Sequence, residues 1–278
     1  MRQDDYGYQL RAAVQRSEII PFIGVYDVFS ATLAAEHFDG IFISGFSFAA
    51  SFYGLPDIGL IAWSDIVAFC QRVRAVLPRQ HIIVDIDDGY GDMDTAAHVV
   101  SLLQGAGASG IIMEDQQRPR RCGHLDGKRL LDLDQYVMRL EKVLASRKDL
   151  FVVARTDAHE QEDVARRVHA YVESGADAIL IDGLHDLDYM KQVTAGLDVP
   201  VMFNQILGGK SAPFSLDQLR GAGVSLANYS TPCLFAAQEA INTAMTALRQ
   251  NDGKPQGGIG IQECNAILND NLNRRDRS

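Results

Sequence analysis

The segment 118–129 carries the most concentrated group of reactive side chains in the sequence. It reads RPRRCGHLDGKR, with Cys122 two residues before His124 and six basic side chains, His124 included. A core could not supply partners for so many charges. We therefore interpret the segment as a mobile loop that meets an anion at a pocket. Its cationic neighbours favour the thiolate form of Cys122, for proton transfer or nucleophilic attack; an ordinary loop cysteine is the alternative.

Acidic residues follow two apolar runs that we interpret as neighbouring strands. Asp85 and Asp87 are two residues apart and so point to the same side, and Glu114 ends the next run. Carboxylates that converge in this way repel one another unless a cation lies between them. Oxygen ligands suit Mg²⁺ or Mn²⁺ rather than zinc, and we predict a metal site. Solvated or salt-bridged acids are the alternative.

Arg155 is the charge that ends the apolar run 150–154. A guanidinium in that place can bind a carboxylate or phosphonate through two hydrogen bonds, and a salt bridge to one of the acids is the alternative. Ser44, Gly45 and Phe46 follow another apolar run. Their backbone N–H groups can bind a carboxylate or carbonyl oxygen, although a plain turn has the same spacing.

Apolar runs alternate with amphipathic stretches and must position these residues. We predict an N-terminal helix at 5–17, an irregular loop at 45–57, and strands at 21–26, 40–44, 81–87, 109–114, 150–154, 178–181, 200–203 and 224–227. Helices are expected between the strands and at 234–249. Eight alternations in about 250 residues favour a closed (β/α)8 TIM-type barrel, whose strand ends form the active site. An open doubly wound sheet is the alternative, but its phosphate-binding fingerprint is absent.

We predict one barrel domain over residues 1–278, with 116–131 as a mobile active-site loop and 251–278 as a helical tail. The composition, 47% hydrophobic and 22% charged, is typical of a globular protein. A net charge of −10 argues against nucleic acid as a partner. No signal sequence or apolar run of about 20 residues is present, so no membrane partner is expected. Four cysteines without a CxxC pair argue against zinc and disulfides and favour a cytoplasmic location.

Several motifs together resemble the isocitrate lyase/phosphoenolpyruvate mutase superfamily over about 230 residues. They are the segments Asp85-Ile86-Asp87-Asp88-Gly89-Tyr90-Gly91, Glu114-Asp115-Gln116, Arg121-Cys122-Gly123-His124-Leu125-Asp126-Gly127-Lys128, Arg155-Thr156-Asp157-Ala158 and Gly54-Leu55-Pro56-Asp57. The resemblance implies a (β/α)8 barrel whose C-terminal helices are exchanged between subunits, giving a homotetramer built as a dimer of dimers.

The resemblance also implies the site. Mg²⁺ (or Mn²⁺) would be held directly by Asp85, with Asp57, Asp87 and Glu114 acting mostly through waters. The expected substrate is a small carboxylate, and the shared intermediate is a metal-stabilised enolate. The implied substrate-binding residues are Ser44, Gly45, Phe46, Asp85, Gly123, His124, Arg155 and Asn204. The implied catalytic residues are Cys122, His124, Arg155 and Asp182.

The Cys-Gly-His loop is similar to that of the carbon–carbon lyases acting on isocitrate, methylisocitrate and dimethylmalate, where the cysteine supplies a proton. Carboxyphosphonoenolpyruvate mutase shares it. Two positions depart from the lyase pattern: Asp182 replaces a glutamate, and Leu207 stands where lyases have another glutamate. The leading hypothesis is a lyase that cleaves a 2-hydroxy di- or tricarboxylate to a 2-oxo acid.

Three other readings stay open: a carbon–phosphorus bond enzyme, an oxaloacetate decarboxylase-like activity, and a non-catalytic 2-oxo acid binder. Carbon–phosphorus chemistry would need phosphonate recognition, for which Arg121 and Lys128 are candidates. Phe46, Phe48 and Phe52 suggest an apolar wall, which favours a methyl- or alkyl-bearing substrate.

Overall fold

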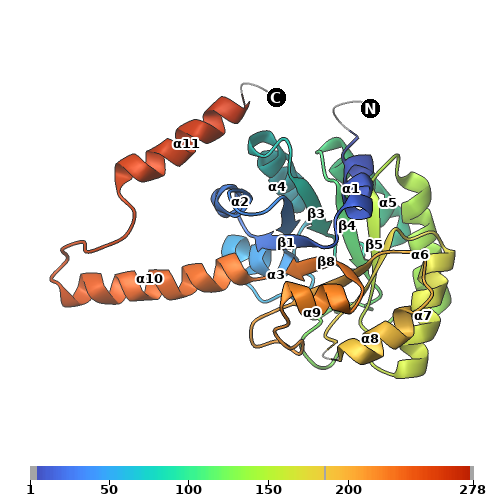
Figure 1. Ribbon diagram of the computed structural model, residues 1–278. Helices are drawn as coiled ribbons and strands as arrows, with labels where there is room; N and C mark the ends of the chain where they lie inside the picture. The colour runs from blue at the N-terminus through green and yellow to red at the C-terminus, as the bar shows by residue number, and fades with distance from the viewer. Residues whose placement is uncertain (1–4, 185, 276–278) are drawn as a thin grey trace.

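Eight parallel strands form a closed barrel in chain order in the computed structural model, which describes residues 5–184 and 186–275 (Figure 1). The predicted (β/α)8 barrel is confirmed, and the open sheet is excluded. The strands are β1 (Ile20–Val25), β2 (Gly40–Ile43), β3 (His81–Asp85), β4 (Gly110–Glu114), β5 (Phe151–Thr156), β6 (Ala178–Ile181), β7 (Val201–Gln205) and β8 (Val224–Tyr229).

Helices surround the barrel and follow the predicted order. They are α1 (Tyr6–Arg16), α2 (Val28–Ala35), α3 (Gly45–Phe48), α4 (Trp63–Val76), α5 (Met93–Gly105), α6 (Leu133–Ser146), α7 (Gln161–Glu173), α8 (Leu187–Thr194), α9 (Leu216–Gly221), α10 (Pro232–Gln250) and α11 (Ile261–Arg275). Side-chain caps fix several of these starts: Asp92 accepts from the backbone N–H of Thr95 at 2.8 Å at the start of α5.

Alternation along each strand divides the apolar residues into two layers. The cluster inside the barrel includes Phe22, Phe42, Ile83 and Ile112. Helix α1 closes the barrel at the amino ends of the strands, where Leu10 joins this cluster. The residues between them face the helices and form the larger outer core. Because successive side chains point to opposite faces, this alternation also decides which strand-end residues reach the barrel mouth.

The segment 45–57 is the main departure from the predicted elements. It was expected to be an irregular loop, but α3 continues into a π-helical turn, η1 (Ala49–Tyr53), which ends at Gly54 with φ +66°. Phe48 explains the difference, because its ring stacks on Phe52 at 4.9 Å and on Phe69 of α4 at 5.1 Å. These contacts hold the segment as a helix packed on the outer core.

Residues 116–131, which we call the flap, are pinned at their base as a narrow antiparallel pair. Gln116 bridges Leu130, and the backbone N–H of Gln117 donates to the carbonyl of Arg129 at 2.7 Å. The flap crosses the carboxyl ends of the strands.

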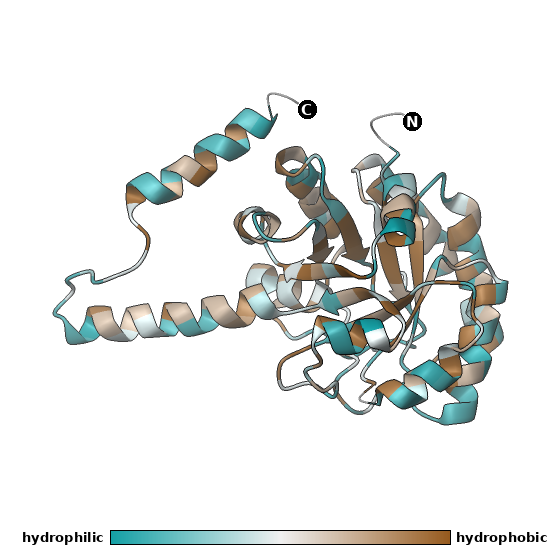
Figure 2. Cartoon of the chain, in the orientation of Figure 1, coloured by the Kyte–Doolittle hydropathy of each residue, from teal (hydrophilic) through white to brown (hydrophobic). Residues whose placement is uncertain are grey.

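The C-terminal helices extend away from the barrel (Figure 1). Helix α10 has no buried residue, and its exposed apolar side chains include Ile241 and Met245, so brown and teal alternate along it in Figure 2. Helix α11 returns toward α4, and Asn271 donates to Thr32 at 2.9 Å. Within the described residues, no helix has the length and apolar character needed to cross a membrane.

Candidate active site

The site lies at the carboxyl ends of the strands and is built by strand alternation. Each key residue lies two positions beyond a residue of the inner core, so its side chain continues into the barrel mouth. Phe42, Ile83, Ile112, Val153, Leu180, Met202 and Leu226 of the inner layer are followed in this way by Ser44, Asp85, Glu114, Arg155, Asp182, Asn204 and Asn228. The fold therefore brings together side chains up to 184 positions apart in the chain.

Four carboxylates gather on one side of this mouth, and Arg120 of the flap lies among them. The Arg120 Nε donates to Glu114 Oε1 at 2.5 Å, and its Nη1 donates to Asp57 and lies 3.1 Å from Asp87 Oδ1. Asp85 Oδ1 accepts the backbone N–H of Asp87 at 3.0 Å. Burial raises the pKa of Asp87 to about 7, helped by repulsion from Asp85, although Arg120 opposes the shift.

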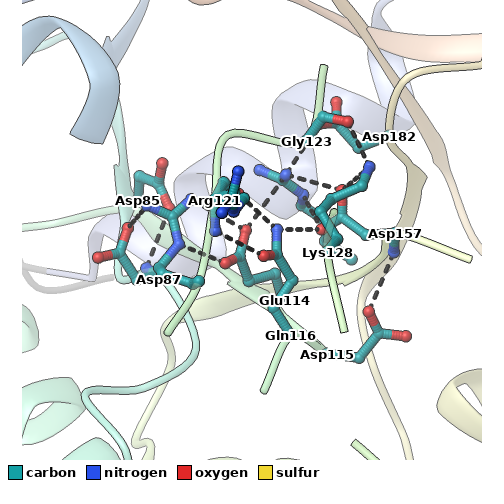
Figure 3. Close-up of polar contacts among 12 residues, drawn as sticks. Asp85, Asp87, Glu114, Asp115, Gln116, Arg121, Gly123, Lys128, Asp157 and Asp182 are labelled. Atoms are coloured by element: carbon teal, nitrogen blue, oxygen red, sulfur yellow. Dashed lines mark hydrogen bonds and ion pairs between the residues drawn. The ribbon is translucent and has the colours of Figure 1, made fainter. Parts of the chain in front are cut away.

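Arg155 connects the acids of β4 with those on the far side of the mouth. Its Nη2 lies 2.8 Å from Asp182, 3.1 Å from Asp157 and 3.2 Å from Glu114. Figure 3 shows Asp85, Asp87 and Glu114 on one side and Asp157 and Asp182 on the other. Burial works against charge on Asp182, yet Arg155 holds the pKa of that carboxyl well below its usual range. Arg155 thus makes salt bridges with the site acids, as in the alternative to substrate binding that the sequence left open.

Cys122 and Gly123 carry the flap into the cavity beside these groups. A Cβ on Gly123 would lie 1.8 Å from Asp182 Oδ2 and 2.3 Å from Arg155 Nη2, so a larger residue would force both side chains out of their present contacts. Burial raises the pKa of the Cys122 thiol to about 12, and Asp57 adds to the shift. The expected thiolate is therefore wrong: Arg120 is bound to the acids, and the buried thiol stays protonated at neutral pH.

His124 is held by the loop that follows β7. Its Nδ1 accepts the backbone N–H of Lys210 at 2.9 Å, so a neutral ring carries its proton on Nε2. Nε2 lies 3.5 Å from Asp182 Oδ1 and 3.4 Å from Asn204 Nδ2, and Asn204 donates to Asp182 at 2.8 Å. Asp182 therefore has donors on three sides. Leu207, in the same β7 loop, is 82% exposed and offers the site no group.

Four residues of the site were missed by sequence reasoning. Arg120 was read only as loop charge. Lys128 was considered only for phosphonate recognition, yet its buried Nζ donates to the carbonyl of Gly123 and to Asp157 at 3.1 Å. Asn228 and Ser230 end β8, where the amide of Asn228 donates to Ser230 Oγ at 3.0 Å. Strand alternation counted back from Leu226 was the signal that could have found Asn228.

The apolar wall expected from three phenylalanines is wrong for two of them. Phe48 and Phe52 stack on each other away from the mouth, and only Phe46 lines the cavity. The opposite wall is polar, because Ser230 donates to Asn204 Oδ1 at 2.6 Å and Asn228 donates to the same oxygen at 3.0 Å. The substrate space is thus bordered by amide and hydroxyl groups toward β7 and β8.

The cavity that these residues enclose measures about 20 Å³, room for about one water molecule. Its lining includes Ser44, Phe46, Asp57, Asp85, Cys122, Gly123, Arg155, Asp182, Asn204, Asn228 and Ser230. A larger hollow of about 610 Å³, lined by His159, Tyr189 and Lys210, touches this site only through Asp182. We assign the chemistry to the small cavity, because it alone combines the thiol, Arg155 and the acids.

The acid cluster has the composition of a divalent-metal site. Asp57, Asp85, Asp87 and Glu114 are four carboxyl groups, and the cations that contact them are Arg120 and Arg155. Both carboxylate oxygens of Asp87 are buried without a hydrogen-bond partner in the described chain. A divalent cation balances the surplus, and oxygen donors suit Mg²⁺ or Mn²⁺. Among the described residues, no three Asp, Glu, His or Cys side chains already surround one point as ligands.

Comparisons with known proteins agree with this site. The model of the phosphoenolpyruvate phosphomutase family matches residues 10–249. The chain is 32% identical to 2-methylisocitrate lyase of Bacillus subtilis (strain 168), over 99% of this chain and 91% of the relative. A crystal structure of 2,3-dimethylmalate lyase matches with a TM-score of 0.90 and 28% identity, covering 96% of this chain and 93% of that one.

Two further solved structures contain small carboxylates. Oxaloacetate acetylhydrolase in complex with 3,3-difluorooxalacetate matches with a TM-score of 0.91 and 27% identity, covering 99% of this chain and 97% of that one. Phosphonopyruvate hydrolase in complex with oxalate and Mg²⁺ matches with a TM-score of 0.85 and 25% identity, covering 99% and 97%. Small carboxylates and Mg²⁺ are thus found together in a protein of this fold.

Proposed function

Since the chain belongs to the phosphoenolpyruvate mutase/isocitrate lyase superfamily, we propose that it is a Mg²⁺-dependent carbon–carbon lyase. Its substrate is a 2-hydroxy di- or tricarboxylate of the methylisocitrate or dimethylmalate kind, and one product is a 2-oxo acid. The observation that carries the proposal is the buried thiol of Cys122, whose pKa burial raises, in one cavity with Arg155, Asp182 and Asp85. That set can bind a carboxylate, accept a hydroxyl proton and deliver a proton to carbon.

Arg155 binds the substrate carboxylate in this proposal. Its guanidinium has several donors in a planar fork, and it exchanges part of its contact with Asp182 for the substrate. The backbone N–H groups of Ser44, Gly45 and Phe46 hold the oxygens of the 2-oxo acid end. Gly45 allows the backbone of residues 44–46 to lie close to the acids, because a Cβ there would lie 3.0 Å from Asp85 Oδ2.

Cleavage moves two protons. Asp182 accepts the proton of the substrate hydroxyl once its contact with Arg155 is weakened, which raises its basicity. The carbon–carbon bond breaks, its electron pair stays on the departing carbon, and the Cys122 thiol gives its proton to that carbon. His124 positions Asp182 through Nε2. Asp85, with Asp57, Asp87 and Glu114, would hold Mg²⁺, which when bound would supply Lewis-acid stabilisation of the developing oxyanion.

The test is 2-oxo acid release over a panel of hydroxy-diacids, with Mg²⁺ and then with a chelator. We expect chelator-sensitive release from one compound group. Cys122→Ser should reduce turnover by about 10²-fold or more while leaving oxo-acid binding nearly unchanged, since only proton delivery is lost. Cys264→Ser, which removes a partly exposed thiol of α11, is the matched control. Unchanged turnover in Cys122→Ser would remove the assigned role.

A second candidate is hydrolytic cleavage of oxaloacetate to oxalate and acetate. Two observations favour it: the polar wall of Asn204, Asn228 and Ser230, and the exposed Leu207 where the lyases carry a glutamate. The structural match to oxaloacetate acetylhydrolase also favours this reaction. Oxaloacetate is therefore included in the panel. Release of oxalate from it, without product release from the hydroxy-diacids, would support this reaction over the lyase.

The remaining readings are outcomes of the same experiment. Phosphorus NMR with phosphonopyruvate detects a carbon–phosphorus enzyme, and carbon dioxide release from oxaloacetate detects a decarboxylase. Binding of a 2-oxo acid without any turnover would identify a non-catalytic binder. A cytoplasmic location stays a prediction from the cysteine pattern.

We further propose that α10 and α11 are exchanged between subunits of a homotetramer. Helix α10 has no buried residue, and its apolar side chains at Ile241 and Met245 are more than half exposed. Leu268 and Leu272 of α11 are similarly exposed. Ile241→Glu combined with Met245→Glu should yield smaller assemblies by light scattering, and an unchanged mass would contradict the exchange.

A further inference from the structure

The flap is bound to the barrel by basic residues that meet acids. Arg118 donates to Asp88 at 2.8–3.1 Å, Lys128 reaches Asp157, and Arg120 enters the acid cluster. Arg120 is 1% exposed and is one of the largest fully buried side chains of the described chain. The closed flap therefore depends on a guanidinium seated among carboxylates.

That closed position leaves no space for a substrate. A cavity of about 20 Å³ holds about one water molecule, whereas a dicarboxylate needs several times that volume. The flap must open before a substrate enters, and Arg120 must then leave the acids. What replaces its charge determines how easily the flap opens, because unpaired buried carboxylates are costly.

Arg120 uses the same oxygens that the outer metal-site acids would offer. Its nitrogens contact both carboxylate oxygens of Glu114, at 2.5 and 3.3 Å, and both of Asp57, the longer contact being 3.4 Å. Asp87 lies 3.1 Å from Nη1 but makes no hydrogen bond to it. Of these four acids in the described chain, Asp85 alone makes no hydrogen bond or ion pair with the guanidinium. A divalent ion among these acids would compete with Arg120 for Asp57 and Glu114 and would repel its charge.

We propose that Arg120 is a tethered counter-cation, which holds the flap closed over the metal-free acids and opposes the binding of a divalent ion. This inference rests on the metal site of the proposed function. It reverses the simple expectation that a metal orders its surroundings. Here the ion loosens the flap, and closure over a loaded site requires the negative charge of a bound carboxylate.

Trypsin tests the position of the flap directly, because Arg121, Lys128 and Arg129 are cleavage sites within it. In the wild-type protein we expect slow cleavage with a chelator present and at least about threefold faster cleavage when Mn²⁺ is added. Oxalate together with Mn²⁺ should slow cleavage again. Slower or unchanged cleavage with Mn²⁺ alone would overturn the inference. Cleavage sites outside the flap, followed in the same digest, control for general effects of the ion on trypsin.

Metal affinity gives a second readout that is independent of activity. We expect Arg120→Gln to bind Mn²⁺ about tenfold more tightly in electron paramagnetic resonance titrations, because a repelling charge is removed. Arg121→Gln is the matched control. It removes the same charge from an exposed neighbour whose backbone N–H contacts Gln116, and it should leave Mn²⁺ affinity unchanged. Arg120→Lys keeps the charge and serves if the glutamine variant fails to fold; its affinity should stay within about twofold of wild type.

The outcomes separate this inference from the proposed function. If neither the wild-type protein nor any variant binds Mn²⁺, the metal site itself is refuted, and the inference falls with it. If the wild-type protein binds Mn²⁺ and Arg120→Gln binds it with equal or lower affinity, only the role of Arg120 is refuted.

Discussion

Two clusters of charged side chains lie at opposite ends of the barrel and differ in their balance. At the amino end of β5 and β6, Arg11 and Arg147 pair with Asp177, and Arg11 also donates to the carbonyl of Asp149. Asp177 accepts the backbone N–H of Val152 at 2.8 Å, and Asp149 accepts that of Gly7 at 2.9 Å. The cluster thus holds two acids and two arginines: both arginines pair with Asp177, and the carboxylates of Asp177 and Asp149 each accept a backbone N–H.

The cluster at the carboxyl ends is unbalanced. Its acids are Asp57, Asp85, Asp87, Glu114, Asp157 and Asp182, and its cations are Arg120, Arg155 and Lys128. A balanced cluster is complete and can only stabilise the fold. A buried surplus of charge is costly by itself, and it persists where a ligand supplies what is missing. The comparison therefore supports the proposed function at the carboxyl-end cluster.

Gly123→Ala should have the largest effect and should affect only the unbalanced end. The added methyl would lie 1.8 Å from Asp182 and 2.3 Å from Arg155, so either these two side chains or the flap must shift from the arrangement that places Cys122 beside them. We expect kcat/KM to fall by about 10³-fold or more, as for loss of a positioned catalytic group, with little change in unfolding temperature. Gly105→Ala is the matched control, because a Cβ at that helix position meets nothing within 4 Å. Full activity in Gly123→Ala would break the assignment of the closed flap.

Substituting one acid at each end sharpens the comparison. Asp182→Asn should reduce kcat about 10²-fold, since the base is lost, and should also lower the free energy of unfolding, because Arg155 holds the pKa of that carboxyl below its usual range and the charged form stabilises the fold. Asp177→Asn should leave kcat unchanged and should lower the free energy of unfolding by about 2 kcal/mol, because two arginines lose their partner. Urea unfolding and initial rates measure both. The same pattern in the two variants would contradict the distinction.

Alkaline pH should destabilise the protein through two buried thiols. The pKa of Cys122 and that of Cys70 in α4 are both raised from 9.0 to about 12, chiefly by burial. A raised folded pKa means that stability is complete below pH 9 and is lost as pH rises through about 12. Each thiol should cost about 1.4 kcal/mol per pH unit above 9. Unfolding titrations between pH 8 and 11 test this, and Cys122→Ser should remove the part of the slope that Cys122 contributes, the rest coming from Cys70 and from other buried groups with a raised pKa, such as Cys233 and Tyr136. A free energy of unfolding that does not change between pH 8 and 11 would contradict the raised pKa of both thiols.

The smallest effect is expected from Leu207→Glu. This side chain is 82% exposed, so the substitution should change the free energy of unfolding by less than about 0.5 kcal/mol. If the β7 loop moves inward with substrate, the new carboxylate would raise activity on the hydroxy-diacids relative to oxaloacetate. Leu207→Gln controls for polarity without charge, and equal rates in the two variants would show that position 207 takes no part in selectivity.

The barrel was predictable because its strands are apolar runs that glycine and helical stretches separate at regular intervals. The inward residues Asp85, Glu114, Arg155 and Asp182 could also be predicted, since the residue at a strand end keeps the alternation of its strand. The neighbours Glu114 and Asp115 illustrate the limit. Both end β4, yet Glu114 enters the mouth, whereas Asp115 accepts hydrogen bonds from Tyr171 at 2.7 Å and Arg167 at 3.1 Å in the outer core.

Properties that depend on burial could not be predicted from spacing. The arginines beside Cys122 suggested a thiolate, but Arg120 turns toward the acids and the thiol is desolvated. Phe48 was expected to line the substrate space. Its ring instead stacks on Phe69 of α4, a contact between distant segments that no local sequence pattern indicates. These features arise from contacts between distant segments.

The pinned base of the flap has a consequence for how such a protein can change. Gln116 bridges Leu130, and the backbone N–H of Leu131 donates to the carbonyl of Asp115 at 2.8 Å, so both ends of the segment are fixed to each other and to the end of β4. Residues between these two points can be replaced or lengthened without moving a strand. The segment can therefore vary as a unit: a lineage can acquire new chemistry by changing about a dozen contiguous codons, while the barrel that positions the strand-end residues is inherited unchanged.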